Sequence, residues 1–414
     1  MLACDMSVAP FSDDPVAVLR HGGADALSLA LMQARNRTLR WLSVFESVPA
    51  QLPPDAGRFS PPAWLAGHAG WFQDWWIARH VQRARGDAAD PRAPRLASIE
   101  PAADRWWSPQ ASRRDQRWQM DLPQGDELRA WLMASFETTL DLLAQAGEGD
   151  DALFVFRAAL WHELRLTEAW AELAQASDLP ATLLEGLWPD GPALPARPAL
   201  ALPAGRWRLG SDRGGFVPEA ERWAHERVLP ESQIDARPVV WAQYVEFVAD
   251  GGYDERRWWS DAGWAWLQAE QSEQGARVPR YVEQVRRGVV LRERGRLVHA
   301  PATQPVRHVT HHEAQAWCAW AGRRLPTEAE WERAECSLAA RGFVWGEVWE
   351  WVADRAAPYP GHAPGALAVP APAGQRVLRG ASWLGAPALR HPRARRWADP
   401  ARDHGFCGFR SCAL

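Results

Sequence analysis

The chain has 414 residues, 47% hydrophobic and 24% charged, which is the composition of a globular protein with room for two or three domains. Its formal net charge of −4 gives no overall basic field, so neither nucleic acid nor a membrane surface is an expected partner. All 47 residues in the Lys and Arg count are Arg, which excludes Schiff-base lysine chemistry and a P-loop lysine. The 27 Trp greatly outnumber the 4 Tyr, and we expect Trp-lined sites.

The cysteines and the amino terminus indicate a cellular compartment. The five cysteines form no CxxC pair, which is typical neither of a zinc ribbon nor of a redox motif and favours a reducing environment. The first 18 residues contain acids where a signal peptide would have positive charge, and no run of about 18 apolar residues occurs. We therefore expect an unexported, cytoplasmic protein.

The first half of the chain has the pattern of helices. In residues 24–48 the apolar residues recur at three- and four-residue steps, and Ser60-Pro61-Pro62 predicts the start of a second helix that runs to about residue 85. Residues 126–146 and 151–177 give two more amphipathic helices. We predict an antiparallel four-helix bundle in which residues 86–123 form a long ordered crossing.

The composition and hydrophobic pattern of the chain change near residue 195. Residues 178–203 are dense in Pro and have no period, as expected for a linker. Beyond them the segments are short and rich in Gly and Pro, with two clear helices at 241–249 and 310–321. This half is predicted to be a loop-rich α+β domain without internal repeats.

Two histidines lie on inward faces of the predicted helices. His68 shares a face with Trp64, Phe72 and Trp75, and His162 lies on the apolar face of the fourth helix. Two inward imidazoles from two helices would begin a metal site, since neutral imidazole suits iron, copper or zinc. The alternative is a pair of core histidines that bind a backbone carbonyl or a Glu. Spacing alone leaves both interpretations open.

Two segments resemble iron-binding motifs. SPPAWLAGH, which ends at His68, resembles the "SPxxWxxxH" segment of the DinB-like domain in the ergothioneine-biosynthesis sulfoxide synthases, and HELRLTEAW, which begins at His162, resembles their HExxHxEA motif. In that family the histidines of both motifs bind non-haem iron. The resemblance implies that His68 and His162 bind Fe(II). At the position of the third ligand this chain has Leu166.

The second half resembles formylglycine-generating-enzyme-like domains. PVRHVTHHEAQAWCAWAGRRLPTEAEWERA, GEVWEWVADR, VLRGASW and GFCGFRSCA follow in that family's order. The implied fold class is α + (α+β): a DinB-like four-helix bundle over residues 20–190 is followed by a formylglycine-generating-enzyme-like (C-type-lectin-like) domain over residues 196–414. We expect the charged and Trp residues of these motifs to hold the fold together.

The resemblance also implies a reaction. In the family, dioxygen on iron drives bonding of a thiol sulfur to the imidazole of hercynine, the betaine of histidine, and the similar selenoneine synthases use a selenosugar. Arg402 matches an arginine that holds the carboxylate of the thiol donor, and Arg117 lies in RRDQRWQMDLP, another segment similar to the family. We expect both arginines to bind substrate. Tyr359 falls where the family has a proton-donating tyrosine, although a structural turn tyrosine is the equal alternative.

The expected acceptor pocket departs from the family. Arg396 and Ala398 replace an Asn and an Asp that contact hercynine, Trp397 lies between them, and Arg165 replaces a Gln. A trimethylammonium group cannot donate a hydrogen bond, so it needs carboxylates or aromatic faces. We expect Arg396, Trp397 and Arg165 to bind substrate in a changed pocket.

Three hypotheses remain at this point. The first is a non-haem iron oxygenase that forms a carbon–selenium or carbon–sulfur bond on hercynine, closest to the selenoneine synthases. The second, based on Leu166, is a metal-free homologue that acts as a binding protein. The third is an enzyme of the same fold with a different substrate. The expected partners are small molecules: hercynine, a selenosugar or thiol donor, and dioxygen. The sequence does not decide between monomer and dimer.

Overall fold

The computed structural model describes residues 14–49, 53, 56–274, 278–286, 288–362, 364–367 and 373–414. Residues 1–13, on which most of the targeting prediction rests, lie outside the described residues. None of the helices in the described ranges combines the length and apolar composition that a membrane crossing needs.

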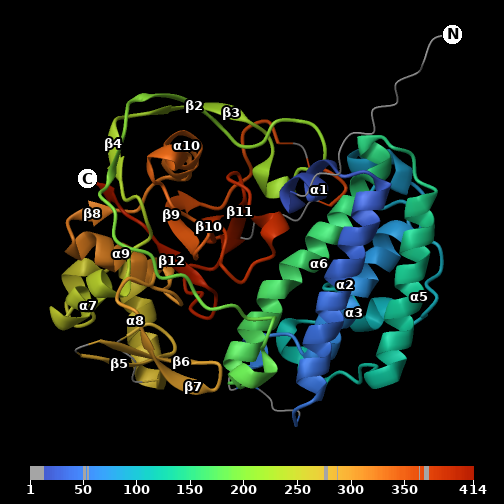
Figure 1. The fold of residues 1–414 in the computed structure, drawn as a ribbon, viewed down its shortest axis with the longest axis horizontal. Helices are drawn as coiled ribbons and strands as arrows, with labels where there is room; N and C mark the ends of the chain where they lie inside the picture. Colours follow the sequence, from blue (N-terminus) through green and yellow to red (C-terminus); the bar gives the residue numbers. More distant parts are fainter. Residues whose placement is uncertain are drawn as a thin grey trace.

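The amino-terminal half is helical (Figure 1). Its helices are α1 (Pro15–His21), α2 (Ala24–Glu46), α3 (Pro62–Gln73), α4 (Ala103–Trp107), α5 (Gly125–Ala144) and α6 (Asp150–Ala176). The four long helices α2, α3, α5 and α6 pack against one another. In Figure 1, α6 lies on the side that faces the other half of the protein and α5 on the far side. Helix α6 buries residues around most of its circumference because it has neighbours on both sides.

The second predicted helix ends earlier than expected. Helix α3 ends at Gln73, and a π-helical turn over Asp74–Ala78 follows it directly. The prediction of a helix to residue 85 is therefore wrong beyond Ala78. Just beyond this turn, His80 forms a β-bridge with Arg95 of the crossing segment. π-Helical turns occur frequently at functional sites.

Two glycines of α3 allow indole rings to approach the helix. A Cβ on Gly67 would lie 2.0 Å from Nε1 of Trp107, and a Cβ on Gly70 would lie 2.5 Å from Cζ3 of Trp131. Trp107 and Trp131 stack on each other with ring centroids 4.1 Å apart. The crossing segment is thereby packed tightly against α3, which fixes the backbone of Trp107 beside this helix.

The carboxy-terminal half mixes helices with small sheets. One four-stranded sheet has the order β11-β10-β9-β12, in which only the β9–β12 pair is parallel, and the other has the order β1-β4-β13-β8. A β2-β3 hairpin and a β5-β6-β7 meander complete the strands. The strands are β1 (Leu200–Leu202), β2 (Gly205–Leu209), β3 (His225–Leu229), β4 (Ser232–Ile234), β5 (Val282–Val285), β6 (Val289–Glu293), β7 (Arg296–Ala300), β8 (Arg323–Arg324), β9 (Trp349–Arg355), β10 (Arg376–Gly380), β11 (Arg395–Ala398), β12 (Cys407–Phe409) and β13 (Cys412–Ala413).

The helices of this half are α7 (Trp241–Ala249), α8 (Asp261–Gln274), α9 (His311–Trp320) and α10 (Glu328–Leu338). The mixed helical and sheet content agrees with the predicted α+β character, and α7 and α9 were expected. The prediction of only two clear helices is wrong, because α8 and α10 are also present. Helix α10 begins at a capping box in which Thr327 and Glu330 satisfy each other's backbone N–H groups.

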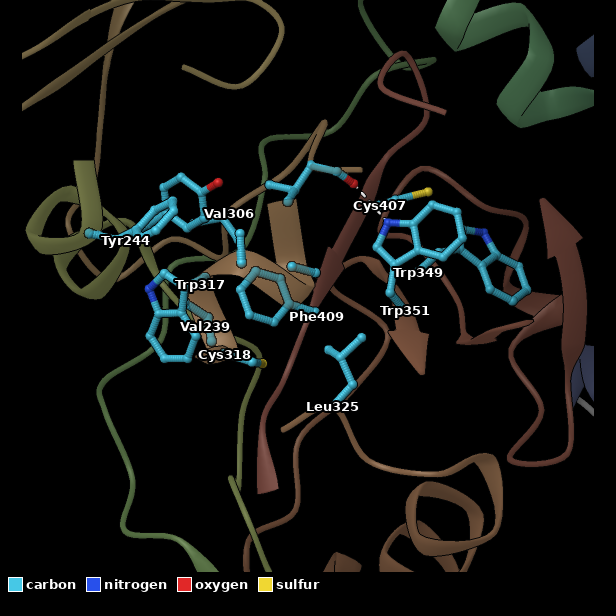
Figure 2. Packing of buried hydrophobic residues seen from close by; sticks show 14 of the residues in the cluster. Val239, Tyr244, Val306, Trp317, Cys318, Leu325, Trp349, Trp351, Cys407 and Phe409 are labelled. Atoms are coloured by element: carbon cyan, nitrogen blue, oxygen red, sulfur yellow. Dashed lines mark hydrogen bonds between the residues drawn. The ribbon is translucent and has the colours of Figure 1, made fainter. Parts of the chain in front are cut away.

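Aromatic side chains build the core of the carboxy-terminal half (Figure 2). Phe409 of β12 lies at its centre, with the ring of Trp317 5.4 Å and the ring of Tyr244 6.5 Å away. Trp351 is fully buried and its Nε1 donates a hydrogen bond of 2.7 Å to the carbonyl of Val309. Figure 2 places Trp349 on the side of this core that Cys407 also occupies.

Candidate functional site

A cavity of about 850 Å³ lies between the two halves of the protein. Its walls come from α3 and α6 of the helical half, and from β9, β11 and loops of the carboxy-terminal half. Tryptophans contribute much of the lining, as expected from the composition: Trp71, Trp75, Trp76, Trp161, Trp349 and Trp397. Because both halves supply walls, the cavity exists only when they are packed together.

The two predicted metal-binding histidines meet at this cavity. The rings of His68 and His162 have centroids 4.8 Å apart in an edge-to-face arrangement, and both residues line the cavity. Nδ1 of His68 lies 2.9 Å from the carbonyl oxygen of Trp107. Because a carbonyl oxygen can only accept a hydrogen bond, Nδ1 of the neutral His68 ring must carry the proton. Nε2 then keeps its lone pair. Nε2 of His162 is buried and has no hydrogen-bond partner among the described residues.

Both imidazoles are neutral at physiological pH. Burial lowers the pKa of His68 to about 4, and the charge of Arg117 adds to this effect. Burial also holds the pKa of His162 well below its usual range, with further contributions from His68 and Arg165. Neutral imidazole is the form that binds a metal, and a backbone carbonyl on the other ring nitrogen is the usual way to orient such a ligand.

Two imidazoles are the metal donors that the described residues bring together at this cavity. In the described part of the chain no three His, Cys, Asp or Glu side chains are placed to share a metal ion. Leu166 packs against the apolar cluster of the helical half. An orphaned imidazole nitrogen beside an oriented second imidazole fits a divalent transition metal held through two protein ligands.

Glu168 connects α6 with the opposite wall of the cavity. Its carboxylate accepts hydrogen bonds from Nε1 of Trp349 (2.8 and 2.9 Å), from Oγ of Ser382 (2.5 Å) and from Nη1 of Arg396 (2.8 Å). The sequence analysis missed this residue, although it is the last Glu of the segment HELRLTEAW. The first Glu of that segment, Glu163, points into the helical half and accepts hydrogen bonds from Arg35.

Three predicted substrate-binding residues line the cavity. They are Arg165 from α6 and Arg396 and Trp397 from β11. The guanidinium of Arg165 lies 4.4 Å from the ring centroid of Trp161, and Arg396 is 5.8 Å from that of Trp349. The structure therefore brings these side chains to the same space as the histidine pair.

Arg402 lies outside the cavity lining. Its Nη2 donates to both carboxylate oxygens of Glu172, a buried residue of α6, at 2.5 Å each. This arginine therefore already has a carboxylate partner within the protein. Arg114, which the sequence analysis did not single out, lies in the same charged region. Burial is the main cause that lowers its pKa, and the charges of Arg402, Glu172 and Arg396 also act on it.

Arg117 contacts the histidine pair indirectly. Its guanidinium lies 3.5 Å from the ring centroid of Trp64, and the ring of Trp64 stacks on His68 at 4.4 Å. Nη1 of Arg117 donates to Oγ of Ser60 at 2.9 Å. The geometry gives Arg117 a supporting position behind His68, and it does not line the cavity.

Tyr359 is buried within the carboxy-terminal half. Its hydroxyl donates to Oε2 of Glu328 at 3.1 Å and accepts from Nη1 of Arg379 at 3.4 Å. Burial raises the pKa of Tyr359 well above its usual value, and Glu328 adds to the rise. Tyr359 does not line the cavity, but Arg395, whose guanidinium is 4.2 Å from its ring centroid, does.

Comparisons with known proteins agree with this architecture. The model of the sulfatase-modifying factor enzyme 1-like domain family matches residues 188–346 and 342–413. The chain is 31% identical to the hercynine oxygenase of Mycolicibacterium smegmatis over 95% of its length and 99% of that protein. It is 32% identical to the hercynine oxygenase of Mycolicibacterium thermoresistibile over 93% of its length and 94% of that protein.

The formylglycine-generating enzyme of Streptomyces coelicolor is 33% identical over 42% of this chain and 58% of that enzyme. The chain belongs to the ergothioneine-biosynthesis sulfoxide synthase family, with a sulfatase-modifying factor enzyme 1-like domain in its carboxy-terminal half.

Proposed function

We propose that this protein is a hercynine-modifying oxygenase in which His68 and His162 bind Fe(II). The reaction is the formation of a carbon–selenium or carbon–sulfur bond on the imidazole of hercynine, closest to that of the selenoneine synthases. One observation carries the proposal. The neutral imidazoles of His68 and His162 line a cavity with their ring centroids 4.8 Å apart, and the Trp107 carbonyl orients the ring of His68. The near full-length likeness to hercynine oxygenases supports it.

In the same proposal the two halves have separate tasks. Residues 20–190 form a DinB-like iron domain, and residues 196–414 form the formylglycine-generating-enzyme-like domain that supplies the opposite wall. The start of the family match at residue 188 supports a boundary in this region. The reaction takes place in the cytoplasm on small molecules, and the protein works as a monomer or a dimer.

The residues of the chain have defined roles in this proposal. Iron, when bound, supplies dioxygen activation. Trp71 and Phe72, which stack beside the two histidines, exclude water from the reacting atoms. Arg402 binds the donor, a thiol or a selenosugar, and an anionic donor must compete with Glu172 for its guanidinium. Arg117 supports His68 through the ring of Trp64, which stacks on the imidazole.

Tyr359 is the proposed proton donor. Because its hydroxyl is bonded to Glu328, proton delivery requires a connection past Arg395, which contacts the Tyr359 ring and also lines the cavity. Replacing Tyr359 with Phe removes the hydroxyl and keeps the ring. We expect this variant to bind substrates normally and to turn over more slowly.

Iron content and oxygen uptake test the proposal. Protein purified without oxygen is assayed for iron per chain by elemental analysis and for oxygen uptake with hercynine and candidate donors. We expect His68→Ala and His162→Ala each to lose iron and donor-dependent uptake. The exposed His299 provides the matched control, and His299→Ala should retain both. If His68→Ala keeps its iron and its activity, the assignment of the site is wrong.

A second candidate function is a metal-free binding protein. It is favoured by the absence, within the described ranges, of a third His, Cys, Asp or Glu beside the histidine pair. Wild-type protein without iron and without oxygen uptake, but with measurable hercynine binding, would favour this candidate over the oxygenase.

A further inference from the structure

The arginines on the cavity wall differ in whether they have an acidic partner. Four of them pair with a carboxylate of the protein: Arg20 with Glu221 (2.8 Å), Arg222 with Glu219 (2.9 Å), Arg395 with Glu328 (2.7 Å) and Arg396 with Glu168 (2.8 Å). The fifth, Arg165, has no hydrogen-bond acceptor or ion-pair partner among the described residues. Its contact is the face of Trp161.

Arg165 is placed to meet a ligand. Its side chain is exposed, yet burial is the first cause that lowers its pKa to about 10, and the charge of Arg396 is the second. Arg165 also lines the cavity, so a small molecule in that space can reach its guanidinium. The side chain is therefore a cation near neutral pH that lines the cavity and has no acidic partner among the described residues.

The neighbouring acid cannot satisfy both arginines. Glu168 already accepts from Trp349, Ser382 and Arg396, so each of its oxygens is used twice. One carboxylate between two guanidinium groups leaves a surplus of one positive charge. An incoming anion with two oxygens would pair with this surplus charge through charge-assisted hydrogen bonds.

We infer that Arg165 and Arg396 form a subsite for a carboxylate group of the acceptor substrate. The subsite lies beside the histidine pair, because Arg165 follows His162 by one turn of α6 and acts on it electrostatically. This inference rests on the proposed function, because it takes the acceptor to be a molecule with an imidazole ring and a carboxylate. The carboxylate end then anchors the acceptor while its imidazole reaches His68 and His162.

The aromatic wall supports the same orientation. Several tryptophans of the cavity already have an arginine over the ring: Trp75 has Arg79 and Arg95, Trp161 has Arg165, and Trp349 has Arg396. A ring face that holds a guanidinium is not free to bind a trimethylammonium group. Affinity should therefore come from the anionic end of the acceptor more than from its cationic end.

Calorimetric titration without oxygen tests the inference with small probes. The probes are 3-(imidazol-4-yl)propionate, which keeps the carboxylate, histamine, which lacks it, and benzoate, which lacks the imidazole. We expect the propionate to bind roughly tenfold or more tightly than histamine, because two charge-assisted contacts are lost with the carboxylate. Arg165→Gln and Arg396→Gln should each remove most of this difference.

Two further variants keep the test interpretable. Arg165→Met preserves packing on Trp161 without the charge, and it should behave like Arg165→Gln. Arg105 stacks on Trp106 outside the cavity lining, so Arg105→Gln is the matched control and should bind all probes as wild type does. Circular dichroism melts establish that each variant is folded.

The outcomes separate this subsite from the proposed reaction. Equal binding of propionate and histamine by wild type, or carboxylate binding unchanged by Arg165→Gln, overturns the subsite. If hercynine is turned over and its KM is the same in Arg165→Gln, the subsite fails while the proposed reaction stands. If carboxylates bind through Arg165 but hercynine gives no oxygen uptake with any donor, the subsite stands and the reaction fails.

Discussion

Removal of the Glu168 carboxylate should destabilise the contact between the two halves. In Glu168→Ala the indole N–H of Trp349 and the hydroxyl of Ser382 lose their acceptor, and both residues are buried. Each unsatisfied buried donor costs about 1–3 kcal/mol. The Arg396 side chain is 25% exposed, so its guanidinium can be hydrated in the cavity and adds less. We expect a loss of about 2–5 kcal/mol in the free energy of unfolding.

Urea unfolding followed by circular dichroism measures this loss. Glu168→Gln keeps one carbonyl oxygen for Trp349 and Ser382 but faces Arg396 with an amide, so about 1–3 kcal/mol is expected. Glu137 is exposed on α5, and Glu137→Gln should change the stability by less than about 0.5 kcal/mol. A loss below that control level in Glu168→Ala would refute the reasoning.

Three other changes have defined outcomes. Burial raises the pKa of Glu313 from 4.5 to about 7, so the folded chain holds a proton that the unfolded chain releases. The free energy of unfolding should fall by up to about 3 kcal/mol as the pH rises from about 4.5 to about 7. Urea titrations at several pH values should show that the free energy of unfolding of Glu313→Gln depends less on pH than that of wild type. Gly67→Ala forces Trp107 away from α3 and should cost about 1–3 kcal/mol in a thermal melt, with less iron per chain because the carbonyl that orients His68 moves. Leu166→His adds an imidazole one turn after His162 and should raise iron per chain in elemental analysis; no change would show that this position does not face the metal.

Periodicity predicted the helices that present one apolar face, and it failed where buried charge replaces apolar residues. Helix α10 buries Glu328, Glu330 and Glu332, and each of them pairs with an arginine outside the helix. A pattern that counts Glu as polar therefore hides the buried face of this helix. The information that makes these acids internal lies in Arg324, Arg379 and Arg395.

Only part of the cavity lining was predicted from the sequence, since Arg117, Arg402 and Tyr359 do not line the cavity. The helical faces of His68 and His162 indicated an inward pair, and the structure places the two rings together. The pairing of Arg402 with Glu172 joins residues 230 positions apart, which no local spacing can predict. Helix α6 is covered on both sides, so periodicity could not tell which buried residues face the helical half and which face the cavity.

The double role of α6 fixes its length. Glu163 points into the helical half, His162 and Arg165 face the cavity, and Glu168 and Glu172 bind arginines of the carboxy-terminal half. Each residue added to a helix rotates the remainder of that helix by about 100° and shifts it by about 1.5 Å. One residue inserted between Glu163 and Glu168 would turn both later acids away from their arginines while leaving the histidine in place. Between residues 162 and 172 an insertion or deletion would therefore disrupt several contacts at once, whereas a substitution removes only the contacts of one residue.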